Sequence, residues 1–106
     1  MENELIDLGL LNSEKVKNQN QDSPLYKEYF MHGASHHLGL DVHDLGNKYR
    51  KFEEGMVVTC EPGIYIKEEN IGIRLENDIL LSKDGPVDLT GNIAIETEEI
   101  EDLMNA

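Results

Sequence analysis

The stretch MVVTCEPGIYI, residues 56–66, predicts two β-strands joined by a tight turn. Val, Ile, Thr and Tyr favour extended backbone, and Pro62-Gly63 interrupts the run as a turn does. GIRLENDILL, residues 72–81, is the third strand candidate, and the polar residues 67–70 between it and the second form a hairpin loop. The centre of the chain is therefore expected to be an antiparallel sheet.

Helices are expected before and after this sheet along the chain. Apolar residues within 5–11 can share one helical face, a stop and a new helix start follow at 12–13, and Pro24 suits the first turn of a short helix. Residues 82–92 predict a turn and then a loop. The tail, residues 95–104, spaces its apolar residues roughly on one helical face. The predicted fold class is α+β: an antiparallel sheet flanked by helices.

The composition excludes several classes of partner. The chain has 106 residues, 9 of them basic and 22 acidic, which gives a formal net charge of -13. Nucleic acid and anionic membranes would repel such a chain, so neither is expected as a partner. No apolar run is long enough to span a bilayer, and no signal segment opens the sequence. Cys60 is the only cysteine, which predicts a cytoplasmic location and a small buried side chain.

All four histidines of the chain fall within HGASHHLGLDVH, residues 32–43. Glycines at 33, 39 and 46 disfavour a helix there and favour two extended pieces around a bend at Gly39. Such a bend can turn His36 and His43 toward one site, although a straight strand would place them on opposite faces. His37 is interpreted as a filler beside His36.

Two carboxylates in the strand candidates could join these histidines. Glu61 ends the first strand, and Arg74 and Glu76 share the face opposite Ile73 and Leu75. Imidazole with two carboxylates suits manganese, iron, cobalt or zinc, and Arg74 would limit the repulsion between the acids. Charged residues on the solvent face of a strand and histidines on loops are also common without a metal, so spacing alone leaves both interpretations open.

The order of the motifs along the chain decides between a metal site and ordinary surface residues. HGASHHLGLDVHDLG (32–46), GMVVTCEPGIYI (55–66), GIRLENDILL (72–81) and then Asp88-Leu89-Thr90 together closely resemble the Xaa-Pro aminopeptidases, or aminopeptidase P. That family shares the pita-bread fold with prolidase, methionine aminopeptidase and creatinase. The resemblance runs from about Leu5 to Met104, and it implies half of a pita-bread fold.

The resemblance implies a role for each residue that matches the family's motifs. The metal ligands would be His36, Glu61 and Glu76, with Glu76 bridging two ions. Glu61 would also relay a proton toward the departing amine, as a catalytic residue. The ions would be two divalent cations, usually manganese in the family, and would activate a water.

Further residues would face the substrate or support the ligands. His43 would contact the scissile carbonyl as a catalytic and substrate-binding residue, and His32 would line the substrate pocket. Tyr65 and Arg74 would steady the metal-binding carboxylates. The implied substrate is a peptide with proline at its second position, from which the residue before proline is removed.

The chain lacks part of what the family needs. Two aspartate ligands that the family carries on earlier strands have no counterpart before His32. Residues 1–106 are therefore expected to be the carboxy-terminal part of a metallopeptidase catalytic domain whose upstream half is absent. Alone, the chain is expected to be inactive, to bind metal weakly or incompletely, and to form a homo-oligomer. A fragment of prolidase, an Xaa-Pro dipeptidase, or a non-catalytic module that associates with itself or with a partner are the alternatives.

Overall fold

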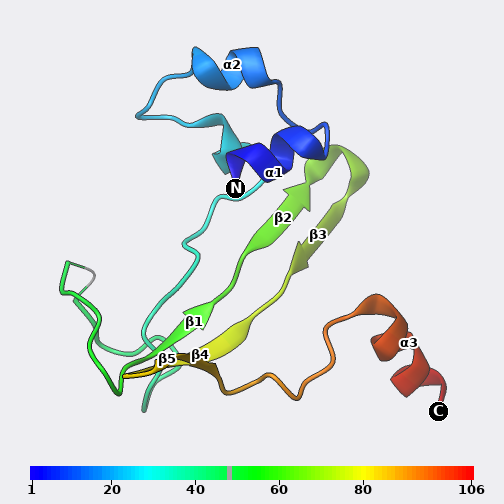
Figure 1. Cartoon of the computed structure of the whole chain (residues 1–106). Coiled ribbons are helices and arrows are strands. Elements are labelled where there is room, and N and C mark those ends of the chain that lie inside the picture. The colour runs from blue at the N-terminus through cyan, green and yellow to red at the C-terminus, as the bar shows by residue number, and fades with distance from the viewer. Residues whose placement is uncertain (48) are drawn as a thin grey trace. The chain divides into compact units, whose positions relative to one another are not determined.

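The computed structural model describes residues 1–47 and 49–106. The chain divides into two compact units, one made of Met1–His32 and Gly63–Ile73, the other of Gly33–Pro62 and Arg74–Ala106. Figure 1 shows their helices and strands, coloured along the chain. The first unit holds the helical start and a two-stranded sheet, and the second holds a three-stranded sheet, so the predicted α+β class is confirmed.

The first unit begins with three short helices. They are α1 (Glu2–Asp7), α2 (Ser13–Lys17) and the 3-10 helix η1 (Leu25–Glu28). Asn12 caps α2, since its side-chain oxygen accepts from the backbone N–H of Glu14 at 2.9 Å. Pro24 lies one position before η1 rather than inside its first turn. The core of this unit is small, with Leu5 fully buried and Phe30 nearly so.

A β-hairpin completes the first unit. Strand β2 (Gly63–Ile66) pairs with β3 (Ile71–Arg74), and a 3-10 turn, η2 (Lys67–Glu69), joins them. Asn70 closes this turn with a φ of 55°, in the left-handed region that asparagine tolerates better than most residues. The polar loop predicted at 67–70 is thus a short helical turn.

The second unit contains the sheet that carries the candidate site. Strand β4 (Asn77–Ser82) lies between β1 (Val57–Cys60) and β5 (Gly85–Asp88), and both pairings are antiparallel. The single strand predicted over 72–81 is broken between β3 and β4. At the break, the N–H of Leu75 donates to the carbonyl of Pro62 at 3.2 Å. The break between β3 and β4 therefore lies beside the break between β1 and β2, which Pro62 and Gly63 cause.

Two predictions for this unit are wrong. Residues 85–88, expected in a loop, form β5: the turn at 83–84 leads into Gly85 at a φ of 125°, and Pro86 is tolerated because β5 is an edge strand. Cys60 is exposed rather than buried, because strand side chains alternate between faces and its neighbour Thr59 takes the inner one.

The predicted terminal helix is α3 (Thr97–Asn105). It follows a long irregular stretch and stands clear of the three-stranded sheet (Figure 1). Its apolar residues Ile100, Leu103 and Met104 are exposed, the last two by 65% and 81%. No helix among the described residues is long and apolar enough to cross a membrane.

Candidate metal centre

The position of His36 is set by backbone hydrogen bonds to β1. The N–H groups of Thr59 and Glu61 donate to the carbonyls of His36 and Ala34, at 2.9 and 2.8 Å, and the N–H of Leu38 donates to Val57 at 3.1 Å. Residues 34–38 therefore run beside β1 as an added extended segment. This pairing brings a histidine from the glycine-rich stretch next to the end of a strand far along the sequence.

The ring of His36 has a defined orientation. Its Nδ1 lies 2.9 Å from the carbonyl oxygen of His37, and because a carbonyl only accepts, Nδ1 carries the proton in this contact. Its Nε2 lies 3.2 Å from Oε1 of Glu61. A lone pair on Nε2 would face a carboxylate oxygen, which repels it unless a proton or a cation lies between. Such fixing of one ring nitrogen by a carbonyl is typical of metal-binding histidines.

Glu61 and Glu76 approach His36 from two strands' ends. One ligand atom of each of the three residues lies within 4.8 Å of the others. Arg74 lies between the two acids, with guanidinium nitrogens 3.6 Å from Glu61 and 3.3 Å from Glu76. Its charge limits the repulsion between two carboxylates at such short range. The structure thus brings together His36, Glu61 and Glu76, as the sequence predicted, and places Arg74 beside both carboxylates.

Thr59 also belongs to this site, and the sequence analysis missed it. It is 2% exposed; its hydroxyl oxygen accepts from the N–H of His36 at 3.0 Å and its O–H donates to Oε1 of Glu61 at 3.0 Å. One hydroxyl therefore ties both candidate ligands to the strand. A threonine within a β-strand is ordinary, and only its position two residues before Glu61, on the same face, could have indicated the contact.

His43 lies beside the predicted metal ligands. Its ring centroid is 4.4 Å from that of His36, with the planes tilted by 48°. The bend at Gly39 thus brings the rings of His36 and His43 together, as predicted. His43 is exposed, which leaves its ring accessible to a substrate.

His32 and Tyr65 form a contact within the first unit. His32 Nε2 lies 2.9 Å from the hydroxyl of Tyr65, and Phe30 packs edge-on against the imidazole. Gly63 and Gly72 leave space for the Tyr65 ring: added Cβ atoms would lie 3.0 and 2.7 Å from it. The roles of His32 toward substrate and of Tyr65 toward the carboxylates stay predictions.

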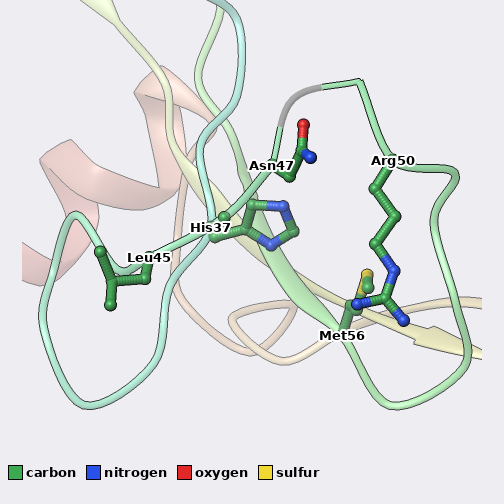
Figure 2. Close-up of a pocket in the computed structure, with 6 residues that line it drawn as sticks. His37, Leu45, Asn47, Arg50 and Met56 are labelled. Atoms are coloured by element: carbon green, nitrogen blue, oxygen red, sulfur yellow. The ribbon is translucent and has the colours of Figure 1, made fainter.

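A hollow surrounds His37, with a volume of about 540 Å³. Figure 2 shows the His37 ring between Leu45, Asn47, Arg50 and Met56. An added Cβ on Gly46 would lie 1.8 Å from that ring, so the glycine is needed for close packing. The guanidinium of Arg50 is already paired with Glu53 at 2.7 Å. His36, Glu61 and Glu76 form the candidate ligand group in the part of the chain that the structure describes.

Comparison with known proteins identifies the class. The model of metallopeptidase family M24 matches residues 5–83, and the chain belongs to that family. It is 42% identical over 113 residues to an Xaa-Pro aminopeptidase of Haemophilus influenzae and 41% identical over 114 residues to that of Escherichia coli. The matches cover 95% and 96% of this chain, and 26% and 25% of those two proteins.

A solved structure gives the same result for the fold. Zinc-substituted aminopeptidase P of Escherichia coli in complex with product superposes with a TM-score of 0.81 at 41% identity. The match covers 95% of this chain and 25% of that one. The chain thus spans about a quarter of the length of the relatives it matches.

Proposed function

We propose that this chain supplies part of the dinuclear metal site of an Xaa-Pro aminopeptidase. The observation that carries the proposal is the convergence of His36, Glu61 and Glu76 ligand atoms within 4.8 Å. Imidazole and carboxylate donors fit a divalent cation, and two carboxylates favour a hard ion such as Mn²⁺. Bound there, the metal would supply Lewis acidity and lower the pKa of a water.

The residues of this chain would then do four things. Arg74 and Thr59 hold the Glu61 carboxylate in place, at the distances given above. His43 donates a hydrogen bond to the oxygen of the scissile carbonyl, which gains negative charge as the bond is attacked. Glu61 accepts the proton of the attacking water and passes it to the departing amine. His32 lines the pocket that receives the peptide.

The proposed substrate is a peptide with proline at its second position. The support is the names of the relatives, which are Xaa-Pro aminopeptidases in both Haemophilus influenzae and Escherichia coli. These names also favour aminopeptidase over the dipeptidase activity of prolidase. In this proposal His36, Glu61 and Glu76 are three of the family's ligands, and the two aspartates of the family's site would come from further sequence.

We expect the 106-residue chain alone to show no turnover of an Xaa-Pro peptide. Grafted into the Escherichia coli enzyme in place of the segment that it matches, it should restore hydrolysis, because the graft reunites all ligands. Release of the amino-terminal residue from a proline peptide is the measurement, with an alanine peptide as the substrate control. A soluble, folded graft that loads metal and still cleaves neither peptide would contradict the proposed function.

We also propose that the isolated chain forms a homodimer or a larger assembly. Ile73 and Val87, on strands, are 63% and 45% exposed, and Leu103 on α3 is 65% exposed. Each such side chain gains roughly 1.5–3 kcal/mol when fully buried. A second copy could recover this burial by pairing along the edge of a sheet or by exchanging a helix, and a two-fold dimer is the commonest closed assembly.

Light scattering at micromolar concentration should therefore give at least twice the mass of 12.0 kDa. Added salt should strengthen association, because it screens the repulsion between two chains of net charge -13. Val87→Lys on the edge strand should weaken it, whereas Asn92→Lys, which adds the same charge outside the sheet, should not. A compact monomer under all of these conditions would exclude the assembly.

The cell compartment is a further proposal. The free, exposed Cys60 supports a reducing compartment, and we place the protein in the cytoplasm. The net charge supports neither nucleic acid nor an anionic membrane as a partner. The proposed partners are therefore the peptide substrate and a second copy of the chain.

A further inference from the structure

The loop that presents His43 is held by one carboxylate. The N–H of Leu40 donates to Oδ2 of Asp44 at 3.0 Å, and the N–H of Leu45 donates to Oδ1 at 2.8 Å. The backbone N–H of Asp44 in turn donates to the carbonyl of His37 at 3.0 Å. Asp44 therefore closes the loop on itself and fastens it to the segment that carries the metal ligand His36.

The close approach of this carboxylate explains Gly39. A Cβ added at Gly39 would lie 2.0 Å from Oδ2 of Asp44, closer than two such atoms can be. A side chain at this position would push the carboxylate out of its place, so the glycine keeps open the space that the carboxylate occupies, and no positive φ is involved. The N–H of Gly39 donates to the carbonyl of Asp41 at 3.2 Å, which tightens the same bend.

Burial contributes little to the shape of this loop. Leu40, Val42 and Leu45 are 100%, 68% and 96% exposed, so their side chains cannot fix the backbone by packing. Hydrogen bonds to a carboxylate are the stronger kind, and here the Asp44 side chain accepts two of them from the loop backbone. Its removal should loosen the loop while the pairing of residues 34–38 with β1 stays intact.

We propose that Asp44 is the positioning residue for His43. By holding the loop closed, it keeps the His43 ring 4.4 Å from that of His36, where an imidazole can reach a carbonyl bound at the metal site. Asp44 itself touches neither ligand nor substrate in this scheme. The inference rests on the proposed function only for what His43 does, and the position of the ring can be measured without activity.

The test uses the whole chain in solution. Asp44→Ala removes both side-chain hydrogen bonds, Gly39→Ala displaces the carboxylate without removing it, and Asp44→Asn keeps one acceptor oxygen. Asp41→Ala is the matched control, since it removes the same charge from the same loop and leaves both Asp44 contacts. Amide exchange at Leu40 and Leu45 and the nuclear Overhauser effect between the two imidazole rings are measured by NMR.

In Asp44→Ala and Gly39→Ala, exchange at both amides should accelerate by ~10-fold or more, and the ring contact should vanish. Asp44→Asn should protect one of the two amides, and Asp41→Ala should match the parent. Co²⁺ titration should stay within about 3-fold in every variant, which separates loss of position from loss of folding. Unchanged exchange or a persistent ring contact in Asp44→Ala would overturn the inference. Absence of Co²⁺ binding in the parent chain would instead count against the proposed metal site.

Discussion

Replacing Glu61 by Gln is expected to weaken divalent-metal binding by roughly 100-fold, about 2.7 kcal/mol. The substitution keeps the size of the side chain and an oxygen that can accept from Thr59, now 3.0 Å away. It removes the negative charge that lies 3.2 Å from the His36 nitrogen. Loss of a residue that merely supports a ligand already costs 10- to 100-fold in metal affinity, so loss of a ligand charge should lie at or above that range.

Titration of the chain with Co²⁺, followed by visible absorbance, measures this effect. Because two aspartates expected in the whole site are missing, affinity of the parent chain should be modest, and the comparison is between variants. Glu69→Gln removes an equal charge from the exposed turn η2 and serves as the matched control. Equal affinity of the Glu61 and Glu69 variants would show that the cation binds through the overall charge of -13 and not at this site.

The same variant distinguishes a functional carboxylate from a structural one. Glu61 is nearly buried at 7% exposure and lies near a second acid. Without metal, its charge is offset by Arg74 at 3.6 Å, which is a loose ion pair. Because Gln removes the repulsion and the cost of burying a charge, we expect thermal stability of the metal-free variant to be maintained or raised.

Much of this site could be predicted from the sequence because the residues fall in strands with period-2 alternation. Glu61 follows a clear strand, and Glu76 and Arg74 alternate with apolar neighbours. Once a strand is assigned, alternation alone decides which side chains share a face. The convergence of His36 with them needed the order of the motifs, because no local rule pairs residues 34–38 with β1.

Thr59 and Asp44 were missed for a different reason. Both act through hydrogen bonds to backbone or to one carboxylate, and those contacts depend on the close approach of segments distant along the chain, or across a bend. Ser, Thr and Asp form such bonds in many contexts, so their presence in a sequence carries no specific signal. Gly39 did carry a signal, which predicted a bend. The structure shows in addition that the absence of a Cβ at Gly39 leaves space for the Asp44 carboxylate.

The strand β5 was missed because local preference and context disagree. Gly and Pro open it, and both residues disfavour strands in general. At the edge of a sheet, however, a proline costs no hydrogen bond when its nitrogen faces outward. The pairing of Leu80 with Val87 supplies the cross-strand contact that holds the segment.

Substitution of His43 should give the largest effect on catalysis. In the grafted enzyme, His43→Ala is expected to lower kcat by about 10²- to 10³-fold, the usual cost of removing one hydrogen-bond donor from a developing oxyanion. KM should change by less than about 5-fold, because the lost interaction strengthens mainly in the transition state. Metal content, measured on the purified protein, should equal that of the parent graft, since His43 is not among the three candidate ligands.

The chemistry of the replacement sharpens this test. His43→Asn keeps an N–H donor on a shorter side chain and should recover part of the lost kcat, whereas His43→Leu fills space without a donor and should recover none. His37→Asn is the matched control, since His37 follows the candidate ligand His36 in sequence and its ring packs against Gly46. If His43→Leu retains kcat within about 5-fold of the parent, the imidazole does not bind the oxyanion.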